Sequence, residues 1–576
     1  MIEKQKTFAG KDGFYFVSIG GSDEIGMNCL LYICDEKILI VDMGIGFPDN
    51  LPGVQVIVPD LSYLFWKKDN IIGLVITHIH EDHCGALPYL LRYLPNLKVY
   101  GTKFCLNFVQ AKLDESGCKE KCNMIEIRDE QIIKLGQDKD DEKSGFEVEF
   151  VHLTHSTPEV MAMYIKTKYG TIFHTSDWKL DDEPVVGSPI NRNRLKQIGE
   201  KGVTAMICDS TNAMVPGHSK SEGSIKGEFE RIISQARNRV IITLFASNVG
   251  RISTILSIAQ KLNKKVCLVG RAVSRVVNAA TESGFFDKFP ADLMINEVEA
   301  HHHKPEDLII LCTGCQAEPL AALTKIVNGT HRHLKFYQTD TVIFSSKMIP
   351  GNEKRISNLY NQICRDNVIL ITSDTNPIHV SGHPAQEELK EMYNYIKPHV
   401  SIPVHGEDLH IAEHAKLANA IGVPKVVVAN NGEVVKIDGN NTSIVDEIKS
   451  GFFCVDGKLF RRDFDPVIKA RKKIMENGVL VILMNFIKKG KFEGNFETQI
   501  FAPGLLDEAN DKSIINDLIA KLNKELSETI QDKDRKDSLS YIAMNIAKKI
   551  CKTRIGKDPI IKVNINFDNS LNPPIK

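Results

Sequence analysis

The sequence predicts an α/β protein of several domains, and three observations support this prediction. The chain has 576 residues, which is more than one hydrophobic core usually organises. Short β-branched runs recur in the N-terminal third, each ending at glycine, aspartate or asparagine, as successive strands of a sheet do. Beyond about Val203, strand-like runs alternate with helical patterns, and this alternation predicts a parallel sheet.

The N-terminal third begins the expected sheet. Strands are predicted at residues 14–19, 29–33, 37–42, 71–76 and 98–101, and a helix at residues 87–94. The charged segment 136–145 has no apolar pattern and is expected to form a hairpin tip or loop.

The middle of the chain continues with strands at residues 205–208, 240–245, 265–269, 308–312 and 341–344, and with helices at 227–237 and 251–262. Further strands are expected at 367–373 and 402–404, before a linker-like stretch at 438–442. A strand at 479–486, helices at 513–526 and 537–551, and a strand at 560–565 predict a small α/β appendage. Its basic patches, 469–473 and 548–557, are expected to be solvated faces.

Composition narrows the class of protein. A hydrophobic content of 43%, a charged content of 25% and a net charge of −1 are those of an ordinary globular protein, so any polyanion site must be a local basic surface. The 13 cysteines form no framework, as expected for reduced thiols in the cytoplasm. Residues 1–4 lack a signal-peptide pattern, and no apolar stretch is long enough to span a bilayer. We therefore expect a cytoplasmic protein without membrane contact.

Residues 77–85 carry a dense set of potential metal ligands. The run Thr-His-Ile-His-Glu-Asp-His-Cys-Gly follows a predicted strand, so it should form a turn at the strand's carboxyl end, where α/β proteins place their sites. Three histidines and an aspartate on one turn would repel one another when protonated and need partners when buried. A divalent metal resolves both problems, since it binds neutral imidazoles and ionised carboxylates. The pattern favours a metal site over an accidental cluster, with His78, His80, Asp82 and His83 as ligands.

Three further candidates follow later predicted strands, namely His155, Asp177 and His405. Together with the turn they supply two sets of donors for two adjacent divalent ions, with Asp177 as a natural bridging carboxylate. Other possible ligands are less suitable, because they lie inside strands, beside better candidates, in surface loops or in cysteine pairs without a second half nearby. These are His152, His174, His379, His301 to His303, Cys118 with Cys122, and Cys312 with Cys315.

The H-x-H-x-D-H turn resembles the signature of the metallo-β-lactamase superfamily. Asp209-Ser210-Thr211-Asn212, Ser381-Gly382-His383 and Pro403-Val404-His405-Gly406-Glu407 look like motifs of its β-CASP branch, which acts on nucleic acids. Three more segments, residues 244–248, 312–319 and 349–353, narrow the resemblance to bacterial ribonuclease J. The resemblance covers roughly residues 10–450 and extends more loosely over the tail. Departures from the family pattern are Ile79, the run Cys84-Gly85-Ala86, Cys315 and Ala317.

The resemblance implies a metallo-β-lactamase αββα sandwich interrupted by a β-CASP α/β domain and followed by a small α/β C-terminal domain. The expected boundaries are 1–205 and 366–440 for the two parts of the lactamase domain, 206–365 for the β-CASP domain, 441–464 for a linker and 465–576 for the C-terminal domain.

By the same resemblance, two zinc ions would be bound per subunit, with manganese or magnesium as alternatives. His78, His80 and His155 would hold one ion, Asp82, His83 and His405 the other, and Asp177 would bridge them. Asp42 would steady the histidine turn from behind the ligands.

The implied activity is hydrolysis of RNA from a 5′-monophosphate end, with internal cleavage as well, in rRNA processing and mRNA decay. Asp82, Asp177, Asp209 and His383 are the expected catalytic residues. For His383 two roles stay open, stabilising the leaving 3′-oxygen or orienting the substrate, and Asp209 would act through hydrogen bonds behind the ligands. Residues at or near predicted strand ends are candidates for holding phosphate, namely Ser247, Asn248, Arg271, Ser345, Ser346, Ser381 and His383.

The expected partners are single-stranded RNA, a second or further copies of the chain in a homodimer or homotetramer, and an RNA-degradation complex. Two other functions compete with the ribonuclease. A lactamase-fold hydrolase of small molecules would need no inserted domain, and a non-catalytic RNA-binding scaffold would not need all seven proposed ligands.

Overall fold

The computed structural model describes residues 8–48, 50–118, 121–138, 141, 144–349, 351–488, 494–530 and 538–567. Some residues considered above lie outside this part: residues 1–4, Lys119 and Glu120 between two cysteines, residues 139–140 and 142–143 of the charged loop, Pro350 and Asp537. The chain divides into two compact units, one of Met1–Gly46 and Val58–Gly451, the other of Phe47–Ile57 and Phe452–Lys576.

The first unit contains a sandwich of two sheets. The eight-stranded sheet has the order β22-β21-β1-β2-β3-β5-β6-β7, and the seven-stranded sheet the order β20-β19-β12-β11-β10-β9-β8. The strands of the eight-stranded sheet are β1 (Phe14–Gly20), β2 (Cys29–Cys34), β3 (Lys37–Val41), β5 (Ile71–Val75), β6 (Lys98–Gly101), β7 (Asn123–Glu126), β21 (Glu433–Lys436) and β22 (Ser443–Glu447). Those of the other sheet are β8 (Ile132–Leu135), β9 (Phe146–Leu153), β10 (Val160–Thr167), β11 (Gly170–His174), β12 (Ala205–Asp209), β19 (Val400–Val404) and β20 (Lys425–Val426).

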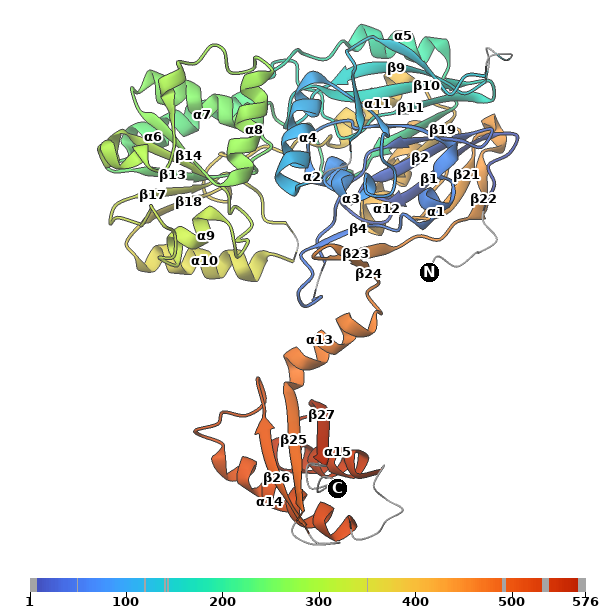
Figure 1. The fold of residues 1–576 in the computed structure, drawn as a ribbon. Coiled ribbons are helices and arrows are strands. Elements are labelled where there is room, and N and C mark those ends of the chain that lie inside the picture. Colours follow the sequence, from blue (N-terminus) through green and yellow to red (C-terminus); the bar gives the residue numbers. More distant parts are fainter. Residues whose placement is uncertain are drawn as a thin grey trace. The chain divides into compact units, whose positions relative to one another are not determined.

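A buried apolar layer joins the two sheets, with side chains such as Phe16 and Val75 from one and Phe150 and Ile207 from the other. Helices cover the outer face of the seven-stranded sheet with a second apolar layer. They are α5 (Arg192–Lys201), α11 (Gln386–Ile396) and α12 (Asp408–Ile421). Beside the eight-stranded sheet lie α1 (Ser62–Trp66), α2 (Glu81–Cys84), α3 (Leu87–Leu90) and α4 (Lys103–Ser116) (Figure 1). The helix expected at 87–94 is therefore shorter than predicted.

A third, six-stranded sheet of the first unit is wholly parallel, with the order β15-β14-β16-β13-β17-β18, as the strand–helix alternation predicts. Its strands are β13 (Val240–Thr243), β14 (Lys265–Val269), β15 (Met294–Ile295), β16 (Leu308–Cys312), β17 (Thr341–Phe344) and β18 (Ile369–Thr372). Its helices are α6 (Lys226–Gln235), α7 (Val249–Lys261), α8 (Arg271–Glu282), α9 (Ala322–Val327) and α10 (Glu353–Arg365) (Figure 1).

Two boundaries predicted from sequence differ from these sheets. The boundary at residue 365 precedes β18, yet β18 pairs with β17 in the six-stranded sheet. The predicted linker 441–464 contains three strands, β22, β23 (Phe452–Asp456) and β24 (Leu459–Arg461). Strand β22 could not be recognised from apolar alternation because all its residues are exposed; backbone pairing with β21 defines it.

The second unit has its own core. Strands β25 (Val479–Lys488), β26 (Gly494–Phe501) and β27 (Ile560–Phe567) form a sheet of order β26-β25-β27. A separate small sheet contains β23, β24 and β4 (Val56–Pro59), and only the first two residues of β4 belong to this unit. Helices α14 (Lys512–Thr529) and α15 (Leu539–Ile550) bury Leu518, Leu522 and Ala543 against the larger sheet, and α13 (Pro466–Asn477) precedes it. Across the described residues of both units, no helix has the length and apolar character of a membrane span.

Candidate metal centre

The candidate ligands come together because strands of both sheets in the sandwich end at the same place. After β5 come His78 and His80, and α2 then carries Asp82 and His83. His155, Asp177 and His405 follow β9, β11 and β19, and Asp209 is the last residue of β12. Residues far apart in sequence thus meet beyond the carboxyl ends of these strands, where α/β proteins commonly place their sites.

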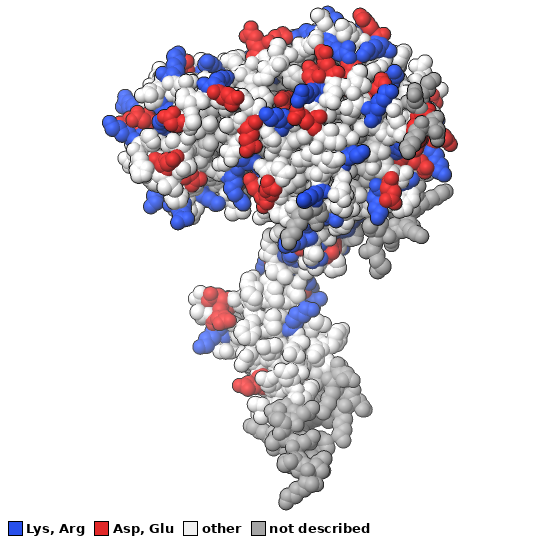
Figure 2. Space-filling view, turned by 45° about the horizontal axis from the view of Figure 1, so that its top comes forward, with Lys and Arg blue, Asp and Glu red and all other residues white. Residues whose placement is uncertain are grey.

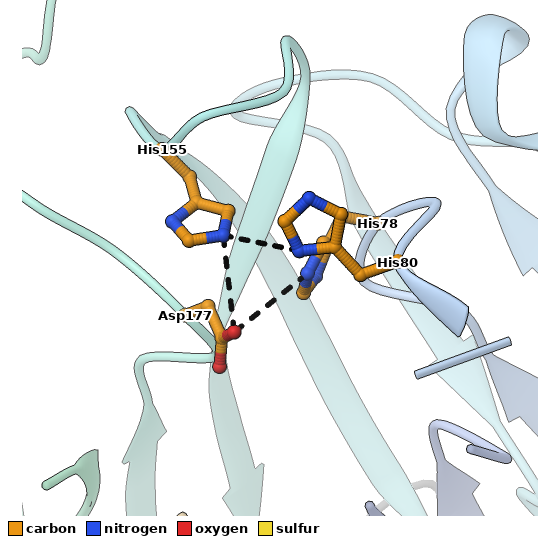
Figure 3. A group of neighbouring side chains, drawn as sticks. All are labelled: His78, His80, His155 and Asp177. Atoms are coloured by element: carbon orange, nitrogen blue, oxygen red, sulfur yellow. Dashed lines mark hydrogen bonds and ion pairs between the residues drawn. The ribbon is translucent and has the colours of Figure 1, made fainter. Parts of the chain in front are cut away.

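One group consists of His78, His80, His155 and Asp177, whose donor atoms all lie within 4.8 Å of one another (Figure 3). Nε2 of His78 and Nε2 of His155 each lie 3.8 Å from Oδ2 of Asp177. His155 Nε2 is 3.2 Å from Nδ1 of His80. The structure therefore brings these four candidate side chains together.

The second group consists of Asp82, His83, Asp177 and His405, again with donor atoms within 4.8 Å. Oδ2 of Asp177 lies 3.3 Å from Nε2 of His83, and Oδ2 of Asp82 lies 3.3 Å from Nε2 of His405. Asp177 therefore belongs to both groups, and its side chain is only 3% exposed. This is the position expected of a bridging carboxylate.

Divalent metal ions fit these residues. Nε2 of His78 is buried and has no hydrogen-bond partner, which is costly unless the nitrogen binds something else. The donors are imidazole nitrogens and carboxylate oxygens, the types that zinc prefers, and their spacing allows three or four of them to share one ion. The chemistry of the donor set therefore accounts for a cluster that would otherwise be unstable.

Hydrogen bonds behind the imidazoles fix which nitrogen faces the site. Nδ1 of His83 lies 2.7 Å from Oδ2 of Asp42, and Nδ1 of His155 lies 2.6 Å from the carbonyl oxygen of Gly382. Nδ1 of His405 lies 2.7 Å from the hydroxyl of Thr211. In each case Nε2 is the nitrogen that faces the centre, an arrangement typical of metal-binding histidines.

Burial keeps one set of histidines neutral. Desolvation lowers the pKa of His78 and of His155 well below the usual value and lowers the pKa of His80 to about 4, with neighbouring histidines adding to the effect. A neutral imidazole is the form that can donate a lone pair to a metal.

In the second group, the carboxylates have the larger influence on the pKa values of the histidines. Burial opposes protonation of His405, but Asp177, Asp209 and Asp82 outweigh it and raise the pKa of His405 to about 10. For His83, burial is likewise outweighed by nearby carboxylates, so its pKa is raised well above the usual value. Burial favours the neutral form of Asp177, yet the surrounding histidines hold its pKa well below the usual range. This concentration of buried negative charge is what divalent cations would balance.

The backbone around the centre is unusually constrained. Asp42, Ser176 and His405 adopt φ values of 64°, 55° and 55°, a region that non-glycine residues rarely occupy. Gly44 leaves room for the turn, since a Cβ atom there would lie 1.7 Å from the carbonyl oxygen of Asp82. The amide of Asn28 donates to that same oxygen at 2.9 Å, which fixes the inner side of the turn.

His383 and Asp209 lie beside the two groups. Nδ1 of His383 is 2.8 Å from Oδ2 of Asp209, and the His383 ring stacks on that of His405 with centroids 5.6 Å apart. Burial lowers the pKa of His383, but Asp209 and Asp177 more than offset this and leave it raised. Asp209, Asp177, His383 and His405 also form a third possible ligand group.

Three histidines set aside in the sequence lie away from the ligand groups. His174 bonds to the hydroxyl of Tyr32 at 3.1 Å, and His152 to the carbonyl oxygen of Ser188 at 2.9 Å. His379 lies 3.0 Å from a guanidinium nitrogen of Arg251. Each has a structural partner of its own.

Sequence reasoning missed the supporting residues Thr77, Asn28 and Thr211. Thr77 donates to Asp42 through both its amide and its hydroxyl at 2.8 Å. The side-chain amide of Asn28 lies 3.1 Å from Nε2 of His83. Thr211 stands in a motif that the sequence does single out, but only the fold reveals its contact with His405.

The candidate phosphate residues have different environments. Ser345 is fully buried, donates its hydroxyl to the carbonyl oxygen of Ile378 at 2.7 Å and accepts from Arg251, so it is not open to a ligand. Asn248 caps α7 by accepting from the amide of Arg251 at 2.9 Å, and the hydroxyl of Ser346 bonds to a carbonyl oxygen. Arg271, at the start of α8, is exposed, and Ser247 is half-buried. The Ser381 hydroxyl accepts from Asn212 at 2.8 Å.

The structure also shows the surroundings of two residues that depart from the family pattern, Ala317 and Cys315. Ala317 has φ 54°, a conformation that favours glycine over alanine. The thiol of Cys315 is buried, and burial raises its pKa above the usual value, so this thiol stays protonated.

Four family profiles match the sequence in chain order. "Metallo-beta-lactamase superfamily" covers residues 25–198, "Ribonuclease J, beta-CASP domain" 237–363, "Zn-dependent metallo-hydrolase RNA specificity domain" 371–428, and "Ribonuclease J C-terminal domain" 466–566. The order is that of a lactamase domain interrupted by an insertion, and the six-stranded sheet holds the β-CASP match.

Whole proteins are similar as well. Ribonuclease J of Sinorhizobium meliloti is 35% identical over 558 residues, which cover 96% of both chains. Ribonuclease J of Mycobacterium tuberculosis is 32% identical over 90% of both chains, and that of Synechocystis sp. is 35% identical over 82% of this chain and 73% of its own. A crystal structure of a protein of unknown function from Enterococcus faecalis V583 matches 74% of this chain with a TM-score of 0.50 at 15% identity, a likeness in fold alone.

Proposed function

Because this chain belongs to the ribonuclease J family, we propose that it uses two zinc ions per subunit to degrade single-stranded RNA, from 5′-monophosphate ends in the 5′-to-3′ direction and also by internal cleavage. The chain is a metal-dependent RNA hydrolase.

The observation that carries the proposal is the shared carboxylate of Asp177. Its Oδ2 atom lies 3.3 Å from Nε2 of His83 in one ligand group and 3.8 Å from Nε2 of His155 in the other. One carboxylate within reach of two sets of imidazoles supports two ions close together rather than one. When bound, such ions supply Lewis acidity, which promotes deprotonation of water and offsets the charge of a phosphodiester.

The protein's own residues would complete the reaction. His383 is held at Nδ1 by Asp209, and its side chain is 21% exposed, so Nε2 is the nitrogen able to give a proton to a leaving 3′-oxygen. Asp209 and Asp177 outweigh burial and raise the pKa of His383, which favours the proton-donating form. Asp209 would orient both His383 and His405, since Oδ1 lies 3.4 Å from Nδ1 of His405.

RNA would be held by local contacts. On the face drawn in Figure 2, basic and acidic side chains intermingle over the first unit, in keeping with a formal net charge of −1. Arg271, Ser247, Ser381 and His383 are the phosphate candidates that remain at least partly exposed, and we retain these in the proposal. We also propose that the C-terminal unit supports a homodimer or homotetramer and that the enzyme works in the cytoplasm, within an RNA-degradation complex, in rRNA processing and mRNA decay.

End-labelled RNA tests the proposal. Purified protein is given the same single-stranded RNA with a 5′-monophosphate or a 5′-triphosphate, labelled at either end, and the products are separated by size. The expected result is release of mononucleotides from the 5′ label, faster with the monophosphate, together with some internal fragments.

The double variant Asp82→Ala, His83→Ala removes two candidate ligands and should abolish both products. Elemental analysis of the wild-type protein should find close to two zinc ions per chain. Unchanged RNA turnover by the double variant would refute the two-metal mechanism, and manganese or magnesium in place of zinc would correct the choice of metal.

A further inference from the structure

Glu81 lies inside the metal-binding turn, yet its side chain interacts with cations outside the ligand groups. Oε2 forms an ion pair with Nζ of Lys112, and Oε1 lies 3.3 Å from Nη2 of Arg275. The other terminal nitrogen of Arg275 is 2.5 Å from Oε2 of Glu115. Two cations and two carboxylates thus form one network against the outer side of the turn.

This network joins two parts of the chain. Lys112 and Glu115 lie on α4, beside the eight-stranded sheet, whereas Arg275 lies on α8, within the β-CASP match. The two helices pack together (Figure 1). Phe104 and Phe285 meet edge to face with ring centroids 5.5 Å apart, and the guanidinium of Arg275 lies 5.1 Å from the centroid of the Phe108 ring. Arg275 is therefore held in place by apolar contacts as well as by charge.

Burial makes this pairing stronger than an ordinary surface ion pair. The side chain of Arg275 is 12% exposed and that of Lys112 is 14% exposed, while Glu81 is 35% exposed. Partial removal from water strengthens the attraction and raises the cost of leaving either partner unpaired. The pair is more confined than exposed pairs of the same unit such as Arg231 with Glu228, whose arginine is 51% exposed.

Glu81 connects this network to the candidate metal centre. Its neighbours in sequence are His80 and Asp82, both candidate ligands. The inner side of the turn is fixed by backbone hydrogen bonds from Asn28 to Asp82 and from Met43 to His83. On the outer side, the side chain of Glu81 is held by Lys112 and Arg275. A shift of Glu81 would move ligands on either side of it.

We propose that Arg275 is a positioning residue through which the inserted domain sets the geometry of the metal-binding turn. The inference rests on the proposed two-metal function. It assigns the insertion a role beyond holding RNA, since α8 contributes directly to how well the turn binds metal. Arg275 touches neither RNA nor metal in this role and acts only through Glu81.

A set of variants in the full chain tests this role: Arg275→Gln, Arg275→Lys, Glu81→Gln and the double variant Arg275→Gln, Glu81→Gln. Zinc affinity is measured without RNA, by competition with a chromogenic chelator, and kcat and KM are measured on 5′-monophosphorylated RNA. We expect Arg275→Gln and Glu81→Gln each to weaken zinc binding and to lower kcat by about tenfold, with KM little changed. The double variant should be no worse than the stronger single variant, and Arg275→Lys should recover much of the loss.

Glu115→Gln is the matched control, because it removes the other carboxylate partner of Arg275 without touching the metal-binding turn. It should bind zinc as the wild type does. Far-ultraviolet circular dichroism of each variant, compared with the wild type, shows that the fold is retained, and Glu81→Gln and Arg275→Lys test the pair even if Arg275→Gln does not fold.

Two outcomes would overturn the proposal. Losses that multiply in the double variant would show that Arg275 and Glu81 act independently, and a change in KM alone would make Arg275 an RNA contact. Because zinc binding is measured without RNA, absence of ribonuclease activity would count against the proposed function and leave the zinc-binding test intact.

Discussion

The carbonyl oxygen of Gly382 lies 2.6 Å from Nδ1 of His155, although the two residues are 227 positions apart in the sequence. The contact joins the second part of the interrupted sandwich to a candidate ligand in the first. It fixes Nδ1 as the protonated nitrogen of His155 and leaves Nε2 for the metal.

Substitution of Gly382 by alanine should disable the enzyme. A Cβ atom at this position would lie 2.5 Å from Cε1 and 2.7 Å from Nδ1 of His155, so the imidazole has to move. We expect kcat to fall by about 100-fold, since displacements near 1 Å in a catalytic site have effects of this size. Steady-state kinetics and zinc content measure the effect. Gly227→Ala is the control, because a Cβ atom at Gly227 would meet nothing within 4 Å beyond its chain neighbours and its own helix backbone. Equal losses in both variants would contradict the explanation.

Asp209→Asn should change the pH dependence of catalysis. Burial lowers the pKa of His383, and Asp209 is the largest of the influences that more than restore it. Without this negative charge the pKa of His383 falls, so the proton-donating form is lost at a lower pH. The alkaline limb of the kcat profile should therefore move to lower pH, with a smaller effect near pH 6.

The profile is measured between pH 6 and 9.5 at saturating RNA, with zinc content checked at each end of the range. A uniform decrease in kcat at every pH would argue that Asp209 positions ligands and has no part in proton donation.

The buried pair of Arg251 and Glu222 should be important for stability. Arg251 is 1% exposed, and two of its nitrogens lie 2.8 and 2.9 Å from the carboxylate oxygens of Glu222. Glu222→Gln would leave a buried guanidinium without its counter-charge and should lower the free energy of unfolding by about 3–5 kcal/mol. Replacing both residues by apolar ones, Arg251→Met with Glu222→Leu, should cost less.

Tryptophan fluorescence during urea unfolding suits this measurement. Both tryptophans of the chain, Trp66 and Trp178, lie in the first unit, so the signal reports on that unit. An equal or greater loss in the double variant would show that packing, rather than the unpaired charge, explains the effect.

His414 should make the first unit less stable in acid. It is fully buried, its ring nitrogens lie 2.8 Å from the Ser210 hydroxyl and 2.9 Å from the Tyr393 hydroxyl, and burial lowers its pKa to about 4. In the unfolded chain His414 binds a proton near pH 6.5, whereas in the folded chain it stays neutral down to about pH 4. The contribution of neutral His414 to the free energy of unfolding is therefore complete above pH 6.5 and declines as the pH falls towards 4. The loss should amount to about 3 kcal/mol over this range.

The comparison uses metal-free protein at pH 7.5 and pH 5, followed by tryptophan fluorescence. His414→Gln should reduce the difference between the two pH values, whereas His218→Gln, which alters a histidine with a 57% exposed side chain, should not. The same pH dependence in wild type and His414→Gln would rule out this histidine as the cause.

The candidate ligands could be picked out from sequence because most of them come shortly after a recognisable strand. His78 and His80 come after an apolar β-branched run, and Asp177 and His405 come soon after similar runs. Chains of this kind bring strand ends together, so donors at those ends are strong candidates. The parallel six-stranded sheet was predictable for a related reason, since its strands are short, apolar and separated by helices.

Other features depend on contacts that no local pattern records. Thr211 supports His405 across 194 positions, and the burial of Ser345 follows from packing against Arg251 and residue 378. Strand β22 is exposed throughout, so only its backbone pairing with β21 reveals it. Residues at strand ends look alike in sequence whether they face a site or the interior, which is why Ser345 was a reasonable but unsuitable phosphate candidate.

The wide spacing of the ligands has a consequence for how the protein is made. The candidate metal centre draws on residues from His78 to His405, and the sheet beneath it gains β21 only at residues 433–436. A growing chain on the ribosome therefore lacks a complete centre until more than two thirds of its sequence has been synthesised. Prematurely terminated products that end before His405 would carry no finished nuclease site, so incomplete synthesis would not release an active enzyme among the cell's transcripts.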